Sequence, residues 1–169
     1  ASRDSACRPV GVETGPDGAF YLIDMQRDVI EHPDYIPEKL RRTLDIRAGE
    51  DRGRIYRLTL TNQPSSRRPQ LSKATSSELV SKLADPNPWW RGTAQRLLVE
   101  RRDATVVPAL REMLGQSEEP FGRLHALWTL VGIAAGTDQD LLLALSDSQA
   151  GLRRAGVLLS EARLNQSRP

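Results

Sequence analysis

A short pattern that recurs three times in the second half of the chain most constrains how this sequence can fold. In each copy an arginine follows an acidic or hydroxyl residue by six positions: Asp85 and Arg91, Ser117 and Arg123, Asp147 and Arg153. The three arginines are 32 and then 30 residues apart. A period of this length is typical of solenoids, in which each repeat buries its apolar face only by stacking on a neighbour.

Apolar residues around these arginines recur with the period of about 3.6 residues that is typical of helices. Six helices are expected, over residues 75–83, 88–101, 105–114, 121–133, 137–145 and 148–164. Two capping boxes are expected at helix starts: Thr75 with Glu78 and Thr137 with Asp140. Gly115 and Gly136 are placed where a left-handed residue can end a helix. The sequence from residue 75 to residue 169 therefore predicts three stacked helix pairs.

The turn residue followed by an arginine resembles the signature of HEAT repeats. That resemblance implies a ladder of polar bonds that bridges neighbouring repeats. In the alternative interpretation, Arg91, Arg123 and Arg153 line a groove for an acidic partner. Binding of nucleic acid is the weakest hypothesis, because acidic residues are interleaved among the arginines and the formal charge is only +2.

Composition excludes several classes of site and protein. Cys7 is the single cysteine, so an internal disulfide and a cysteine-based metal cluster are excluded. No apolar run reaches the length of a membrane span, and the first residues lack the apolar stretch of a signal peptide. Aromatic residues make up only 5% of the chain, which favours a core of small aliphatic side chains.

The first sixty residues carry strand signals instead. Four short strands in meander order are expected, over residues 9–14, 19–24, 28–31 and 53–60, with a tight turn at 15–18 and a helical turn at 38–44. The predicted fold class is α+β: a small four-stranded antiparallel sheet, the content of one propeller blade, followed by the helical solenoid. The predicted divisions are a sheet segment over 1–60, a linker over 61–74 and the solenoid over 75–169.

Longer stretches of sequence point to a family. RPVGVETGPDGAFYLIDMQRDVIEHPDYIP (8–37) and GRIYRL (53–58) resemble the last blade of bacterial β-propeller proteins related to soluble sugar dehydrogenases. LVSKLADPNPWWRGTAQRLLVERRD (79–103) and RLHALWTLVGI (123–133) resemble the HEAT array that follows that propeller. Proteins of this family are exported, are often described as membrane-bound dehydrogenases, and in many cases end in a cytochrome c domain.

The resemblance implies a parent oxidoreductase with a quinone, and in some relatives a haem c, and a periplasmic or otherwise exported location. This chain departs from the pattern because it has no CxxCH haem site and at most one blade. We therefore predict a non-catalytic segment of a larger sugar or alcohol dehydrogenase-like protein, with both ends internal to a longer chain. The helices would be a docking or spacer module. In the alternative hypothesis, the chain is a stand-alone HEAT scaffold that binds a protein partner.

Few residues are candidates for chemistry. Asp24 and His32 are weak candidates for a cofactor pocket, although a side chain that ties down a turn is the favoured interpretation for Asp24 and turn packing for His32. Trp89 is a candidate for an exposed binding surface, although packing over the edge of the repeat is the favoured interpretation. His125 is expected to be a hydrogen-bonded helix residue. No catalytic constellation, phosphate loop or metal-ligand spacing is predicted from these residues.

Overall fold

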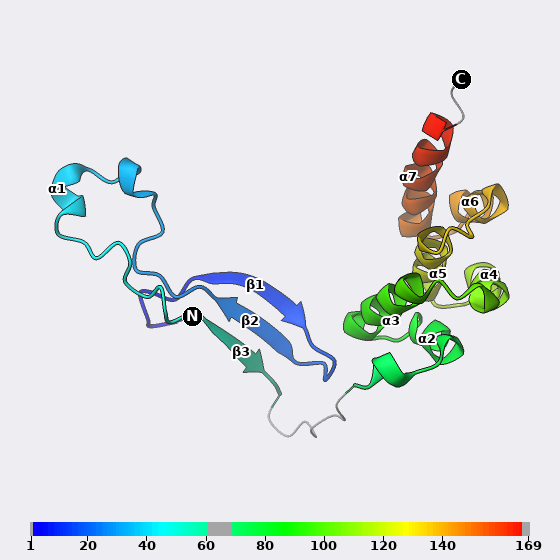
Figure 1. Cartoon of the computed structure of the whole chain (residues 1–169), viewed down its shortest axis with the longest axis horizontal. Coiled ribbons are helices and arrows are strands. Elements are labelled where there is room, and N and C mark those ends of the chain that lie inside the picture. The colour runs from blue at the N-terminus through cyan, green and yellow to red at the C-terminus, as the bar shows by residue number, and fades with distance from the viewer. Residues whose placement is uncertain (1, 61–68, 167–169) are drawn as a thin grey trace. The chain divides into compact units, whose positions relative to one another are not determined.

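The computed structural model describes residues 2–60 and 69–166. The chain divides into two compact units, Ala1–Arg67 and Arg68–Pro169, called here the sheet unit and the helical unit (Figure 1). Most of the expected linker, residues 61–68, lies outside the described residues. The remainder of it contains the 3-10 helix η2 (Leu71–Lys73), and Leu71 is buried in the core of the helical unit. Among the described residues, no helix has the length and apolarity that crossing a membrane requires.

The sheet unit contains three antiparallel strands in the order β1 (Pro9–Thr14), β2 (Phe20–Asp24) and β3 (Arg54–Leu58). The tight turn expected between the first two strands is present. Gly18 donates to the carbonyl of Gly15 over 3.0 Å and has a φ of 75°, a conformation that glycine adopts without steric cost. The Asp17 carboxylate accepts a hydrogen bond from the Ala19 amide.

The prediction of a fourth strand at residues 28–31 is wrong for the described chain. Strand β2 ends at Asp24, and the amides of Met25 and Arg27 still donate to the carbonyls of Arg8 and Ala6. Gln26, between them, adopts a left-handed conformation with a φ of 51°. The chain then forms a long excursion with a 3-10 helix, η1 (Pro33–Tyr35), and a short helix, α1 (Glu38–Arg41), where the helical turn was expected. The sheet therefore has three strands instead of four.

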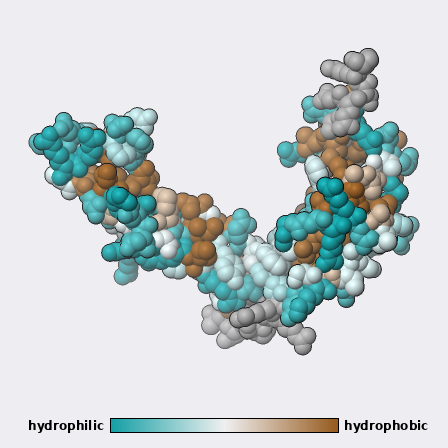
Figure 2. Space-filling view, in the orientation of Figure 1, coloured by the Kyte–Doolittle hydropathy of each residue, from teal (hydrophilic) through white to brown (hydrophobic). Residues whose placement is uncertain are grey.

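Both faces of this sheet carry apolar side chains that remain exposed. Cross-strand partners share a face in an antiparallel sheet, so Val12, Leu22 and Tyr56 lie on one face and Ile23 with Ile55 on the other. Figure 2 shows hydrophobic residues at the surface of this unit. The exposed apolar residues of the three strands are Val10, Val12, Phe20, Ile23, Ile55, Tyr56 and Leu58.

Six helices form the helical unit, as the periodicity predicts. They are α2 (Ser76–Lys82), α3 (Pro88–Arg101), α4 (Val107–Gln116), α5 (Pro120–Gly132), α6 (Asp138–Leu145) and α7 (Ala150–Gln166), with a 3-10 turn η3 (Ala104–Val106) before α4. Consecutive helices pack as pairs, α2 with α3, α4 with α5 and α6 with α7. The second helices of the pairs contact one another in the order α3, α5, α7, and the first helices in the order α2, α4, α6. This arrangement is a three-repeat solenoid (Figure 1).

The helix starts follow the predicted capping, whereas two helix ends do not. Both capping boxes are formed, with Thr75 and Thr137 accepting the amides of the third helical residues. Gly115 does not end α4, which continues to Gln116 and is followed by an extended residue. The left-handed residue after α5 is Ala134, with a φ of 62°, and not Gly136.

The core of the helical unit consists of leucine, alanine and valine, in agreement with the low aromatic content. Its fully or nearly fully buried members are Leu79, Leu83, Ala94, Leu98, Leu110, Ala126, Leu127, Leu130, Ala144 and Leu152. Burial of a leucine side chain stabilises a fold by roughly 1.5–3 kcal/mol. The repeats are therefore joined by a continuous apolar core along the two rows of helices.

Candidate interaction surface of the helical unit

The three arginines of the repeated pattern make the same contact in each repeat. Each side chain turns back and donates from Nη1 to two carbonyl oxygens of the turn that precedes its own helix. The distances are 2.6 and 2.8 Å from Arg91 to Asp85 and Pro86, 2.6 and 3.4 Å from Arg123 to Ser117 and Glu118, and 2.8 and 2.7 Å from Arg153 to Asp147 and Ser148. We call these three arginines and their turn residues Asp85, Ser117 and Asp147 the arginine ladder.

The turn residues of the ladder are also equivalent to one another. Each side-chain oxygen accepts the backbone amide two residues further on. The pairs are Asp85 with Asn87 at 3.0 Å, Ser117 with Glu119 at 3.2 Å and Asp147 with Gln149 at 2.7 Å. The amide so bonded lies at the entrance of the following helix, where backbone donors lack intrahelical partners. An acidic or hydroxyl residue at this position therefore orders the turn.

One contact of the ladder joins two neighbouring repeats. Arg123 donates from Nε to Asp147 Oδ2 over 2.8 Å and from Nη2 to Asp147 Oδ1 over 3.0 Å. Each side chain of this forked pair is only 12% exposed. The Arg123 guanidinium holds the pKa of Asp147 below its ordinary value of 3.8. Forked arginine–carboxylate pairs of this kind add geometric specificity as well as energy, so the pair fixes the register of α5 against the turn before α7.

The lowered pKa of Asp147 predicts a specific loss of stability in acid. A carboxyl group whose pKa is lower in the folded state stabilises the fold above its unfolded pKa, and that contribution disappears as the pH falls through the folded pKa. We expect the free energy of unfolding of the wild type to fall below about pH 4. Asp147→Asn should have a lower free energy of unfolding than the wild type at pH 7, and the difference should narrow as the pH falls below about 4. Urea unfolding of the wild type and of Asp147→Asn at each pH measures these free energies. A difference that stays constant with pH would contradict the role given to the Asp147 carboxylate.

The equivalent position between the first and second repeats lacks a carboxylate. Ser117 occupies the place of Asp147, and the Nε of the buried Arg91 has no hydrogen-bond partner among the described residues. The guanidinium instead lies over the ring of Phe121, with 4.5 Å between the guanidinium carbon and the ring centroid. A buried donor without a partner costs stability, so this junction is weaker than the next one.

Replacing Ser117 by aspartate should therefore stabilise the protein. The carboxylate of Ser117→Asp can keep the hydrogen bond to the Glu119 amide and also accept from Arg91, as Asp147 does in the next repeat. We expect the free energy of unfolding to rise by about 1 kcal/mol in urea titration. Ser117→Asn is the matched control, because it retains the turn bond without the charge. If Ser117→Asp and Ser117→Asn have the same free energy of unfolding, an aspartate at position 117 does not bind Arg91 as Asp147 binds Arg123.

A second set of arginines, which the sequence analysis missed, ties helices to backbone carbonyls. Arg101 donates to Ala74 over 2.7 Å, and Arg163 donates to Gly136 over 2.6 Å. Both carbonyls directly precede the threonine of a capping box, and both pairs are 27 residues apart. An alignment of the repeats on their ladder arginines would have shown that these two arginines recur. Arg101 lies ten residues after Arg91, and Arg163 lies ten residues after Arg153.

Trp89 and His125 contribute to packing between helices. Trp89 is half-buried, packs against the core and meets Trp90 edge-to-face, with 5.4 Å between ring centroids. His125 Nδ1 lies 2.5 Å from Gln95 Oε1, which joins α5 to α3. Burial lowers the pKa of His125. A neutral imidazole that bonds a glutamine across helices agrees with the expected structural role.

The structure places the two cofactor candidates of the sheet unit in different surroundings. Asp24 is 1% exposed, and its Oδ1 accepts the amides of Arg8 over 2.7 Å and Gln26 over 3.0 Å. These bonds, led by that of Arg8, lower the pKa of Asp24. His32 is exposed, accepts the Asp34 amide at the start of η1 and lies near Tyr35.

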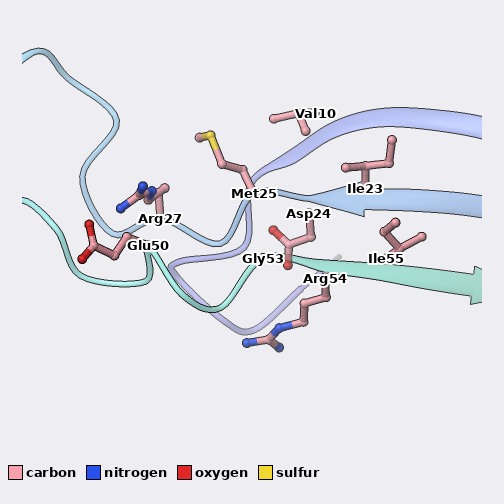
Figure 3. A pocket seen from close by; sticks show the side chains of 9 residues that line it. All are labelled: Val10, Ile23, Asp24, Met25, Arg27, Glu50, Gly53, Arg54 and Ile55. Atoms are coloured by element: carbon pink, nitrogen blue, oxygen red, sulfur yellow. The ribbon is translucent and has the colours of Figure 1, made fainter.

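Asp24 borders an open cavity in the sheet unit, shown in Figure 3. Val10, Ile23 and Ile55 form its apolar side, and Arg27 and Glu50 lie at the opposite end. His32 is not among its lining residues. The described residues do not include a group of three or more His, Cys, Asp or Glu side chains that could hold a metal ion. The geometry of Asp24 is that of a residue that ties down the chain at the end of β2.

Removal of the Asp24 carboxylate should open this part of the sheet unit. Asp24→Ala leaves the amides of Arg8 and Gln26 without their acceptor in a buried place. We expect hydrogen exchange at these two amides to accelerate by about tenfold or more in the full chain. Asp24→Asn, which keeps an acceptor oxygen, should change the exchange rates less. Unchanged exchange in Asp24→Ala would show that these bonds do not hold the turn.

The last repeat presents an apolar surface that the described chain leaves open. A cavity between α6 and α7 is lined by Asp138, Leu141, Leu142, Leu145, Ser160, Arg163 and Leu164. Val157 and Leu158 on α7 are also exposed. We call the exposed apolar residues of this last helix pair, Leu142 and Leu145 of α6 and Val157 and Leu158 of α7, the end face. Exposed apolar patches of this kind mark interaction sites in folded proteins.

Comparison with known families assigns each unit separately. Residues 76–160 match the HEAT repeats family, and residues 1–62 match a domain of unknown function (DUF7133). Searches of curated proteins and of solved structures gave no match. The match over 76–160 covers the six helices of the solenoid almost completely and includes all members of the arginine ladder.

Proposed function

Because the chain belongs to the HEAT-repeat family, we propose that its helical unit is the protein-docking module of a larger, exported dehydrogenase-like protein. HEAT repeats suggest an interaction or scaffold role, since stacked helix pairs build extended binding surfaces. The observation that carries the proposal is the end face, where large apolar side chains of α6 and α7 remain exposed. The role proposed for this segment is non-catalytic.

The sheet unit supports the part of the proposal that concerns the larger protein. A three-stranded sheet with apolar side chains exposed on both faces needs cover on both sides, and isolated small sheets are marginally stable in water. Neighbouring sheets of a propeller would supply such cover on either face. We propose that the sheet unit belongs to a propeller whose blades together hold a quinone, and that the protein is exported. A haem c of the parent protein would be bound by an attached domain.

The docking role can be tested by retention of a partner on the full chain. Tagged wild type, incubated with the exported fraction of the source cells, is expected to retain a defined protein in stoichiometric amount. Leu158→Asp, which places a charge on the end face, should abolish retention. Leu40→Asp is the matched control, because Leu40 is equally exposed but lies on α1 of the sheet unit. Equal retention by wild type and Leu158→Asp would refute docking at this surface.

The proposal of a dehydrogenase-like parent has its own test. The coding sequence upstream of Ala1 is expected to encode a signal peptide and five or more further blades. Cell fractionation should then place the protein outside the cytoplasm. An open reading frame that begins at Ala1 would instead favour the stand-alone scaffold, for which the separate core of the helical unit is the supporting observation.

A further inference from the structure

Ser117 occupies the turn of the arginine ladder that lacks a carboxylate. In the next repeat, the Asp147 carboxylate accepts the Gln149 amide and also receives Nε and Nη2 of Arg123. Within the described residues, the Ser117 hydroxyl makes only the first of these two contacts, with the Glu119 amide. A group that lengthens this side chain and carries negative charge would therefore complete the pattern.

The donor for such a group is already in place. Arg91 is 7% exposed, and its Nε has no hydrogen-bond partner among the described residues. The carbonyls of Asp85 and Pro86 hold its Nη1, as the carbonyls of the next turn hold Nη1 of Arg123. The guanidinium lies over the ring of Phe121, but that contact supplies no oxygen acceptor to Nε. Arg91 is thus oriented as Arg123 is, without the acceptor that Arg123 has.

The turn at Ser117 is accessible and is suited to a doubly charged anion. Ser117 is half-buried and borders an open cavity between α2 and α4. Its carbonyl accepts Nη1 of Arg123, so a second guanidinium lies beside the same turn. The turn leads into α5, which has no side-chain cap, and the backbone donors at a helix start favour negative charge. A phosphoryl group opposite arginine and at a helix start makes new charged hydrogen bonds.

Two neighbouring glutamates favour an attached phosphate over a free one. Glu118 and Glu119 directly follow Ser117, and both are exposed. Their charges oppose the capture of an anion from solution, because like charges repel. A phosphate on Ser117 Oγ does not have to be captured, since its covalent bond keeps it at the turn. The surroundings therefore favour modification of the serine.

We propose that Ser117 is a phosphorylation site, and that its phosphoryl group binds Nε of Arg91 and so joins the first repeat to the second. The donor is the γ-phosphoryl group of a nucleoside triphosphate, transferred by a serine kinase. A bond forms from Ser117 Oγ to the γ-phosphorus, the bond to the leaving nucleoside diphosphate breaks, and the hydroxyl proton passes to a base of the kinase. The proposal is independent of the docking function. An exported chain would be modified before it leaves the cytoplasm.

The effect can be measured on the full chain with phosphoserine incorporated at position 117 during synthesis. We expect the folded-to-unfolded ratio in urea titration to be about tenfold higher than in the unmodified chain, which is typical of one charged hydrogen bond. Arg91→Lys keeps the positive charge but loses the Nε donor. In this background the phosphate should raise the ratio by less than about threefold.

Phosphorus NMR checks the contact without a second variant. A guanidinium beside the phosphate stabilises its doubly charged form, so the second pKa of the phosphate on Ser117 should lie below about 6 in the folded chain. In concentrated urea this pKa should return to about 6. Equal stability of the phosphorylated and unmodified chains, or a pKa that does not change on unfolding, would overturn the inference.

Two further results separate modification from its alternatives. Inorganic phosphate, added to the unmodified chain at constant ionic strength, should leave the urea midpoint unchanged. A rise that Arg91→Lys abolishes would overturn the inference in favour of a site for a free anion. Mass spectrometry of protein from the source cells should find phosphate on the tryptic peptide 112–123, in which Ser117 is the only residue with a hydroxyl group. A peptide that is unmodified throughout growth would overturn the inference, whereas the docking function would stand.

Discussion

Arg123→Ala is expected to lower the free energy of unfolding by about 3 kcal/mol, because it breaks a largely buried ion pair and leaves Asp147 without its partner. The substitution removes two charged hydrogen bonds between repeats and a short bond to the Ser117 carbonyl within the repeat. Urea unfolding of the full chain, followed by circular dichroism of the helices, measures the loss.

The chain offers a matched control for this prediction. Arg153 makes the same two contacts with carbonyls of its own repeat, but no ion pair within the described residues. Arg153→Ala should therefore cost about 1 kcal/mol, the typical contribution of hydrogen bonds of this kind. In a double-mutant cycle, Arg123→Ala and Asp147→Ala should show a clear coupling energy. Equal costs for the two arginine substitutions would mean that the inter-repeat pair contributes nothing.

Leu127→Ala is expected to cost about 3 kcal/mol as well, by a different mechanism. Leu127 is fully buried on α5, in the row of helices that joins the three repeats. Its truncation removes apolar contacts and leaves a cavity that the helices fill only in part. We expect the urea midpoint to fall while the m-value, the slope of the unfolding free energy against urea concentration, stays unchanged. The m-value stays the same because unfolding exposes the same extent of surface in both proteins.

A leucine of the end face provides the comparison. Leu142→Ala should change the free energy of unfolding by less than about 1 kcal/mol, because this side chain is mostly exposed. A similar cost for Leu127→Ala and Leu142→Ala would show either that the core is loosely packed or that the end face is covered in solution. Sedimentation of the two variants distinguishes these explanations.

The helical half could be predicted from sequence because its signals are local and repeated. A capping box needs only a threonine and an acidic residue three positions later, and both boxes formed as expected. The spacing of Asp147 and Arg153 likewise predicts a turn followed by a helix. The bridge from Arg123 to Asp147 follows from the period of the repeat, since the next turn comes one repeat later.

The missed features depend on contacts that a single sequence does not display. Gln26 is left-handed, and its amide donates to the Asp24 carboxylate. Neither residue type predicts this conformation. Ala134 is left-handed although Gly136 lies two residues away. Arg101 and Arg163 recur at the same place in two repeats, but the sequence does not show that their partners are backbone carbonyls. The partners of Arg101 and Arg163 lie 27 residues away in the sequence, so tertiary contacts decide these two positions.

The most direct test of the central claim is a comparison of hydrogen–deuterium exchange in the full chain with and without the protein that it retains. Docking at the end face predicts slower exchange in peptides that cover α6 and α7, near Leu142, Leu145 and Val157. Peptides of α2 and of the sheet unit should exchange at unchanged rates. Protection confined to α2 and α3, or to the sheet unit, would contradict the account.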